Sequence, residues 1–312
     1  MPVAPISAIF SISDRNKPMA ASEANATIEN AAPNRVRRFF SAFRHLFDRP
    51  VTAFGTTVFL LFVLLALVGP SIAPYGANEQ VYADARQAPS VEHWFGTDNL
   101  GRDVFSRVLY GARVVLTQAG LGTILAVICG TFLGLVTGYR SGWLDEITMR
   151  LFDSLLALPA LLLALLLLGT VGQSQNAVLI VIVVVYTPIV ARVARSVVLS
   201  VRTKGFVEAA QLQGESQRWI LFREILPSVM PALTVEGALR FSYAIFLVAS
   251  LGFLGVGVQP PSPNWGLMVS EARVYASQLP WALFFPAAAI ALLVIGVNLM
   301  ADGVKNTLQS SD

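Results

Sequence analysis

The chain has 312 residues, of which 55% are hydrophobic and only 13% are charged. A soluble domain carries about 25% charged residues, so the composition excludes an ordinary soluble domain and indicates a membrane protein. The net charge of +3 is small, and the only cysteine, Cys129, excludes an intramolecular disulfide. Two histidines and one cysteine are too few for a His/Cys metal site of structural spacing, so no metal site is expected.

Six apolar segments are long enough to cross a bilayer, which takes about 20 residues each. They are expected near residues 51–69, 114–138, 152–171, 177–198, 229–257 and 282–303. Together they form one all-α transmembrane domain over residues 49–307, followed by a short C-terminal tail at 308–312. Residues 1–34 are rich in Ala, Ser, Asn and Pro, and residues 1–48 are predicted to be a largely disordered cytoplasmic tail.

Lys and Arg residues flank the expected spans unevenly. With the N-terminus inside, fourteen lie on the cytoplasmic side and five on the outer side. The fourteen are Arg35, Arg37, Arg38, Arg44, Arg49, Arg140, Arg150, Arg192, Arg195, Arg202, Lys204, Arg218, Arg223 and Lys305, and the five are Arg86, Arg102, Arg107, Arg113 and Arg273. Because cytoplasmic flanks carry the excess of basic residues, both termini and the loop at 200–227 are predicted to be cytoplasmic.

Small residues recur every four positions along the second span. They are Gly122, Ala126, Gly130, Gly134 and Gly138. Such a ridge lets another helix backbone approach closely. Its partner is either a helix of the same chain or a helix of a second subunit.

A long loop precedes the second span, on the side predicted to be outer. Thr97 or Asp98 can cap the helix that enters this span. Arg102, Asp103 and Arg107 can pair locally, and exposed pairs of this kind contribute about 0–1 kcal/mol. From these residues alone, the loop is expected to be a folded outer cap.

The loop at 200–227 contains two short helical patterns around a glycine. Residues 206–213 predict a helix that Gly214 ends in a left-handed conformation. Ser216 can cap a second helix, which Pro227 is expected to end. The apolar faces expected are Phe206, Ala209, Ala210 and Gln213 on the first helix, and Trp219, Phe222 and Leu226 on the second. A helix–Gly–helix elbow of this kind can lie in a groove of a partner protein.

This elbow resembles the signature loop of ABC-importer permeases, which carries E-A-A, three residues, G, nine residues and I-x-L-P. The matching positions are Glu208, Ala209, Ala210, Gly214, Leu226 and Pro227, and Glu224 departs from the usual Ile. Two further stretches, F-G-T-D-x-x-G-R-D-V-x-S-R at 95–107 and Q-P-P-S-P-N-W-G at 259–266, are similar to the C-type permease of the dipeptide/oligopeptide/nickel importer family. The similarity covers residues 50–307.

The resemblance implies the type I ABC permease fold, with six transmembrane helices, in the bacterial cytoplasmic (inner) membrane. It implies a second homologous permease as heterodimer partner, two ABC ATPase subunits that bind ATP and Mg, and an extracytoplasmic solute-binding protein. This chain would bind no cofactor itself, and transport would follow alternating access. The implied ATPase-coupling residues are Glu208, Ala209, Ala210, Gly214, Trp219, Leu226 and Pro227, and the implied contacts with the binding protein are Asp98, Arg102, Asp103 and Arg107.

The motifs of common enzymes are absent from the sequence. A P-loop needs Gly-Lys followed by Ser or Thr, and none of Lys17, Lys204 and Lys305 follows a glycine. Neither Gly-x-Ser-x-Gly nor His-Glu-x-x-His occurs, so no catalytic residue is assigned. The basic residues follow the membrane topology and form no groove, so nucleic acid is not expected as a partner.

Glu236 and Arg240 are four residues apart inside the fifth expected span, hence on one helical face. Ionisable residues at membrane depth usually face a bundle interior or a water-filled path. One hypothesis is that the pair lines or gates the conduit. The alternative is that the span starts later and the pair lies at the membrane interface.

Two other classes of protein are compatible with the residues alone. A secondary transporter should show inverted repeats with broken helices, and no clear repeat relates residues 51–171 to 177–303. A membrane-embedded enzyme needs a polar constellation within the spans, which only Glu236 and Arg240 approach. The solute also stays open among dipeptides, oligopeptides, glutathione, nickel and metal chelates.

Overall fold

The computed structural model describes residues 47–309, apart from the side chains of the last two of these. The chain divides into a unit at Met1–Arg44 and a unit at His45–Asp312. The first unit, and with it nearly all of the tail expected at 1–48, lies outside the described residues. Within the described range, every regular element is a helix.

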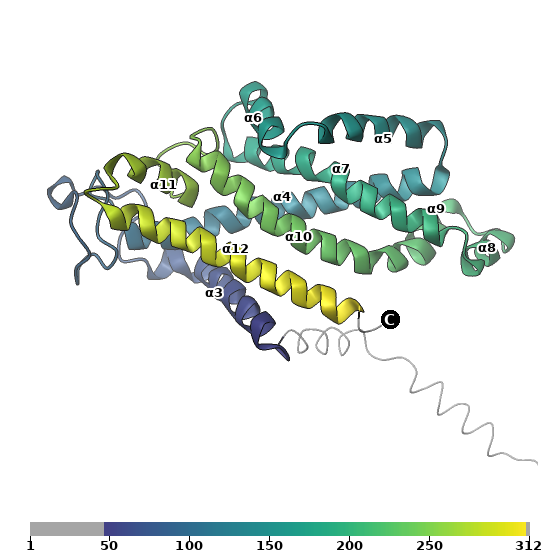
Figure 1. Cartoon of the computed structure of the whole chain (residues 1–312), viewed down its shortest axis with the longest axis horizontal. Helices are drawn as coiled ribbons and strands as arrows, with labels where there is room; N and C mark the ends of the chain where they lie inside the picture. Colours follow the sequence, from purple (N-terminus) through teal and green to yellow (C-terminus); the bar gives the residue numbers. More distant parts are fainter. Residues whose placement is uncertain (1–46, 310–312) are drawn as a thin grey trace, which may run out of the picture. The chain divides into compact units, whose positions relative to one another are not determined.

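Five helices are long and apolar enough to cross a membrane. They are α3 (Pro50–Ile72), α4 (Val104–Arg140), α7 (Gln175–Val201), α10 (Leu226–Phe253) and α12 (Pro280–Gln309). The shorter elements are η1 (Tyr82–Asp84), α5 (Trp143–Leu156), α6 (Ala160–Val171), α8 (Gly205–Leu212), α9 (Gln217–Trp219), η2 (Ile220–Ile225), α11 (Trp265–Ala272) and η3 (Arg273–Tyr275). In Figure 1, α11 lies at one end of the helical bundle and α8 at the other.

The third expected span is not a single helix. The helices α5 and α6 meet at a bend of 96°, and the break falls at residues 157–159. Pro159 causes the break, because proline lacks an N–H for the preceding turn and disfavours helical geometry at the residue before it. A continuous helix over 152–171 is therefore a wrong expectation, although α5 and α6 together can count as one broken sixth span.

Pro227 does not end the second helix of the elbow. The chain runs on from α9 through the π-helical segment η2 into α10, and Pro227 lies in the first turn of α10. A proline is tolerated there because the first helical N–H groups have no partner within the helix. The elbow is thus continuous with the fifth span, which ends at Phe253 rather than at residue 257.

The glycine ridge of α4 packs against α7 of the same chain. A Cβ added at Gly134 would lie 2.5 Å from the Ala191 carbonyl oxygen and 2.5 Å from the Ala194 Cβ. At Gly130 it would lie 2.6 Å from the Val190 Cβ. The backbones of the two helices therefore approach to a distance that only glycine allows, and the intramolecular interpretation of the ridge is confirmed.

Candidate functional site

Gly214 turns the chain between α8 and α9. Its φ of +79° lies in the left-handed region, where an L side chain is strained. The Glu215 N–H donates to the Ala210 carbonyl oxygen at 3.1 Å and closes the end of α8. Ser216 accepts a hydrogen bond from the Trp219 N–H at 3.3 Å and so caps α9. The conformations predicted for Gly214 and Ser216 are confirmed.

The elbow, defined as residues 205–227, buries Val207, Ala210, Ile220 and Ile225 in a cluster with Val198 of α7. The faces expected from the helical period do not coincide with this buried face. Of their residues, Phe206, Ala209, Gln213 and Phe222 are exposed, Trp219 and Leu226 are half-buried, and Ala210 is buried. In the second helix the π-helical η2 contributes to the difference, because its i→i+5 bonding shifts the register after Trp219.

The outward face of α8 carries side chains without a partner in the described part of the chain. Leu212 is 89% exposed, and Glu208, on the same short helix, is exposed as well. Within residues 47–309, no side chain pairs with the Glu208 carboxylate. Phe206 adds an exposed aromatic ring, whereas the exposed ring of Phe222 lines an apolar groove between α4 and α10. Large exposed apolar residues on a short helix are typical of a protein–protein contact.

The four charged residues expected to contact a partner at the cap (residues 73–103) and the start of α4 are all buried. They are Asp98, Arg102, Asp103 and Arg107. The Arg102 Nε donates to Asp98 Oδ2 at 2.5 Å, and its Nη2 donates to Glu271 Oε2 of α11 at 2.7 Å. The Arg107 Nη1 donates to the Ala77 carbonyl oxygen at 2.8 Å. These side chains tie the cap to α4 and α11, so the expectation that their pairs are exposed is wrong.

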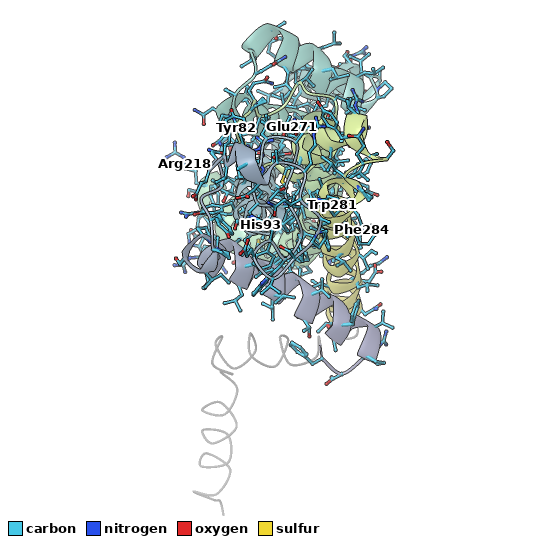
Figure 2. The ribbon with its side chains drawn as sticks, turned by 90° about the vertical axis from the view of Figure 1, so that its left-hand side faces the viewer. Tyr82, His93, Arg218, Glu271, Trp281 and Phe284 are labelled. Atoms are coloured by element: carbon cyan, nitrogen blue, oxygen red, sulfur yellow. The ribbon has the colours of Figure 1, made fainter. Side chains whose placement is uncertain are left out.

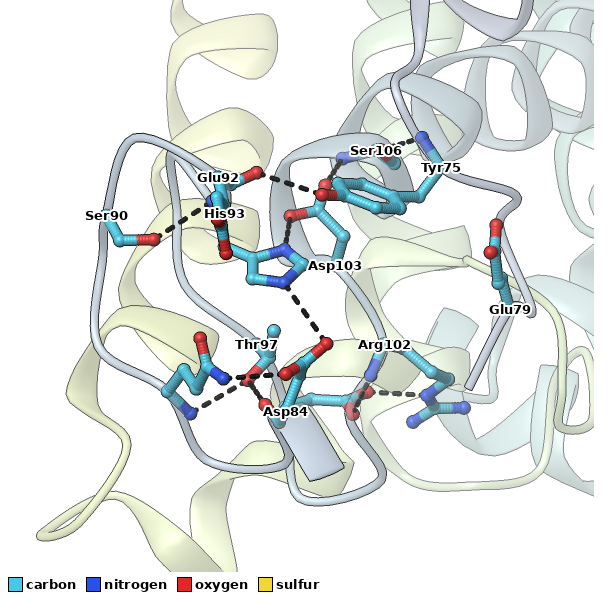
Figure 3. Close-up of polar contacts among 12 residues, drawn as sticks. Tyr75, Glu79, Asp84, Ser90, Glu92, His93, Thr97, Arg102, Asp103 and Ser106 are labelled. Carbon is cyan, nitrogen blue, oxygen red and sulfur yellow. Dashed lines mark hydrogen bonds and ion pairs between the residues drawn. The ribbon is translucent and has the colours of Figure 1, made fainter. Parts of the chain in front are cut away.

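Asp103, rather than Thr97 or Asp98, caps α4. Its Oδ2 accepts from the Ser106 N–H at 2.7 Å, while its Oδ1 lies 2.9 Å from His93 Nδ1 (Figure 3). His93 is buried, and its ring lies against that of Tyr75 with the centroids 4.9 Å apart. Sequence reasoning did not single out His93, because nothing in the local sequence places it against a residue ten positions later.

The surface of the cap is made by other residues. Val91 is 92% exposed, and Tyr82 and Trp94 are also largely exposed. Tyr82 is seen at the end of the bundle that carries the cap in Figure 2. Trp94 is held at its base by Phe105 of α4, with the ring centroids 4.8 Å apart. The cap therefore presents apolar side chains outward on a framework of buried charges.

Glu236 and Arg240 form an ion pair in the middle of α10. Arg240 Nε lies 2.7 Å from Glu236 Oε1, and the side chains are only 15% and 12% exposed, respectively. The guanidinium carbon of Arg240 lies 4.8 Å from the centroid of the Tyr243 ring and 5.8 Å from that of Tyr186 on α7. With a rise of 1.5 Å per residue, the pair lies about 15 Å from the nearer end of α10.

The elbow and the cap lie at opposite ends of the bundle, and the ion pair is separate from both (Figure 1). Among the described residues, no group of three or more His, Cys, Asp or Glu residues could hold a metal ion. Five long apolar helices and one broken pair, with the cap at one end and the elbow at the other, define a multi-pass helical membrane protein.

Comparisons with known proteins show to which family of membrane proteins the chain belongs. Residues 130–310 match the family described as "Binding-protein-dependent transport system inner membrane component", and residues 38–89 match the "N-terminal TM domain of oligopeptide transport permease C". The dipeptide transport system permease protein DppC of Alkalihalophilus pseudofirmus is 38% identical over 292 residues, which cover 94% of this chain and 96% of the relative. The glutathione transport system permease protein GsiD of Escherichia coli is 38% identical over 278 residues, covering 88% and 92%.

The chain belongs to the family of binding-protein-dependent transport system inner membrane components. It is a multi-pass inner-membrane permease of the ABC importer type, and its relatives are named as permeases rather than enzymes. This membership decides against the secondary transporter and the membrane-embedded enzyme. The resemblance stated from the sequence is confirmed.

Proposed function

We propose that this chain is one transmembrane half of an ATP-driven importer of peptides, with dipeptides or glutathione as the first solutes to test. The other half would be a homologous permease, and the conduit would lie between the two. Two ATPase subunits would bind ATP and Mg, and a solute-binding protein would deliver the solute. The solute class follows the relatives, which are named for dipeptide and glutathione transport.

The observation that carries the coupling proposal is the outward face of the elbow. Phe206, Glu208 and Leu212 of α8 are exposed there with no use inside the described part of the chain. Phe206 and Leu212 would fill apolar pockets of an ATPase subunit, and Glu208 would make a charge-assisted hydrogen bond to it. Ala209, which is exposed and small, would allow close approach of the partner.

The remaining coupling residues would act from inside the elbow. Gly214 would set the angle between α8 and α9, and Ala210, Trp219 and Leu226 would fasten the elbow to the core beneath it. Pro227 would stiffen the first turn of α10. Because η2 runs into α10 without a break, a push on the elbow would reach the helix that carries Glu236 and Arg240. The pair would then line or gate the conduit in alternating access.

The cap would receive the solute-binding protein. Asp98, Arg102, Asp103 and Arg107 are buried, so their role in this contact would be to hold the cap rigid. Direct contact would fall to exposed residues such as Tyr82, Val91 and Trp94. This assignment requires the orientation predicted from the Lys and Arg distribution, with the elbow in the cytoplasm and the cap outside.

Co-purification tests the proposed function. The full chain is expressed with its genomic neighbours, solubilised in detergent and isolated by a tag on this subunit. We expect the ATPase subunits to copurify with the unaltered chain and to be lost with Leu212→Asp, which places a charge in an apolar contact. Tyr82→Ala, an exposed apolar residue at the opposite end, is the matched control and should retain them. If no ATPase copurifies with the unaltered chain, the proposed assembly is wrong.

A further inference from the structure

Arg240 carries hydrogen-bond donors that have no acceptor among the described residues. A guanidinium has five N–H groups, and Nε lies 2.7 Å from Glu236 Oε1 in an ion pair that lacks hydrogen-bond geometry. No acceptor among residues 47–309 binds the two terminal nitrogens, Nη1 and Nη2. The four N–H groups of these two nitrogens are therefore available to a group outside the described part of the chain.

These donors lie within a membrane-spanning helix, which indicates that they have a function. Charged side chains within a membrane span are costly, and they are kept where they meet a partner or a water-filled path. Arg240 is mostly covered by protein, because the rings of Tyr186 and Tyr243 flank its guanidinium. Tyr243 is itself about half exposed, so the site opens at the surface where this ring emerges.

We propose that Arg240 is a transit site for the carboxylate of the solute. The planar guanidinium presents paired N–H groups that match a carboxylate in bidentate geometry, and the two tyrosine rings hold its plane. Glu236 neutralises Arg240 while the site is empty and offers a counter-charge to the ammonium group of the same solute. The inference rests on the proposed function, in which this pair faces the conduit and the solute is a peptide.

A carboxylate fixed on the second permease is the competing acceptor for the free N–H groups. Glu236 already neutralises Arg240, so a second permanent carboxylate would leave a net negative charge in a poorly solvated place, which is costly. A zwitterionic solute avoids this cost because it brings its own cation. The balance of charges therefore favours a passing solute over a fixed partner group.

Cysteine labelling tests the transit site on the assembled complex. Cys129 is the only cysteine, so Cys129→Ser gives a background without thiols. Tyr243→Cys then reports on the site, because this half-exposed ring flanks the Arg240 guanidinium. The rates of reaction are compared for anionic sulfonatoethyl and cationic trimethylammonioethyl methanethiosulfonate.

We expect both reagents to react, with a ratio of anionic to cationic rates that depends on the pair. Arg240→Gln should lower this ratio by about fivefold and Glu236→Gln should raise it by about fivefold, as for one nearby charge in a wet site. Alanylphenylalanine should slow the labelling, whereas its C-terminal amide should not. Equal protection by both peptides or by neither overturns the transit site, as does a ratio that neither substitution changes.

Phe246→Cys is the matched control, one turn further along α10. Phe246 lies in an apolar groove with residues of α6, α11 and α12, so neither charged reagent should reach it from the conduit. Absence of labelling at position 243 as well would mean that the pair is sealed or faces lipid, and it would overturn the proposal. Copurifying ATPase subunits are measured on the same samples. If the ATPase subunits copurify but neither substitution changes the ratio of labelling rates, only the transit site is wrong. If the ATPase subunits do not copurify, the proposed function is wrong.

Discussion

The cap and the elbow lie at opposite ends of the bundle and use their charged side chains in opposite ways (Figure 1). In the cap, Arg102 bonds Asp98 and Glu271 away from water. In the elbow, Glu208 has no partner within the described part of the chain, and Leu212 is almost fully exposed. Charged motif residues thus build a framework at one end of the bundle and belong to an exposed surface at the other.

The difference teaches how to separate structural from contacting residues in a permease of this family. The buried ion pairs of Arg102 join the cap to α11 and so fix the loop between two spans, because losing either partner leaves a buried charge unpaired. An exposed leucine on a short helix contributes little to the fold. Its exposure to water is explained by a partner protein that covers it. Substitutions at the two ends should therefore have separable effects, on stability at the cap framework and on coupling at the elbow.

Arg102→Ala should have the largest effect. It leaves the buried Asp98 without its cation and Glu271 with only Arg107, at 3.9 Å, which costs about 3–5 kcal/mol of stability. We expect a large fall in the thermal unfolding midpoint of the purified complex, because the cap is no longer held against α11. Arg150→Ala is the control, because Arg150 and Glu146 have the same i,i+4 spacing but are exposed. Equal effects of the two substitutions would remove the distinction between framework and surface.

Trp94→Ala should have the next largest effect, on binding and with little on folding. An exposed tryptophan in a contact contributes about 2 kcal/mol, equivalent to about 30-fold weaker binding. The measurement is the concentration of solute-binding protein that half-maximally stimulates ATP hydrolysis by the reconstituted complex. An unchanged half-maximal concentration would show that the binding protein docks elsewhere on the outer face.

Gly214→Val should uncouple the elbow without unfolding the bundle. A Cβ at this position meets nothing within 4 Å, so the cost is conformational and amounts to about 1–2 kcal/mol. We expect reduced stimulation of ATP hydrolysis by the binding protein, with only a small fall in the unfolding midpoint. Gly205→Ala is the control, because this glycine also has open space around it and lies within α8. Similar losses in both variants would contradict a role for the left-handed turn.

Asp103→Asn should have the smallest effect. Asparagine caps helices about as well as aspartate, so the capping bond to Ser106 should persist at a cost below about 1 kcal/mol. Asp103→Ala removes both the cap and the partner of His93 and should lower the unfolding midpoint clearly more. If the two variants unfold at the same temperature, Asp103 stabilises the cap through its charge and not as a helix cap.

Much of the local structure follows from residues close together in the chain. The turn at Gly214 and the cap at Ser216 depend on φ and on one hydrogen bond, both local properties. The buried face of the elbow does not follow from neighbouring residues. The π-helical η2 changes the helical period, and Ile220 and Ile225 are buried in a cluster that includes residues of α7. Pro159 contained the signal for the break between α5 and α6, but a hydropathy window averages over a single proline.

The sequence alone determined the apolar spans, the glycine ridge and the motif spacing, because hydropathy, helical period and local turn chemistry are written in neighbouring residues. Only the tertiary structure decided that α7 is the partner of the ridge and that the charges of the cap face inward. It also placed Tyr186 of one helix over Arg240 of another. These features join residues tens to more than a hundred positions apart, and pairings of that range are set by how the helices pack.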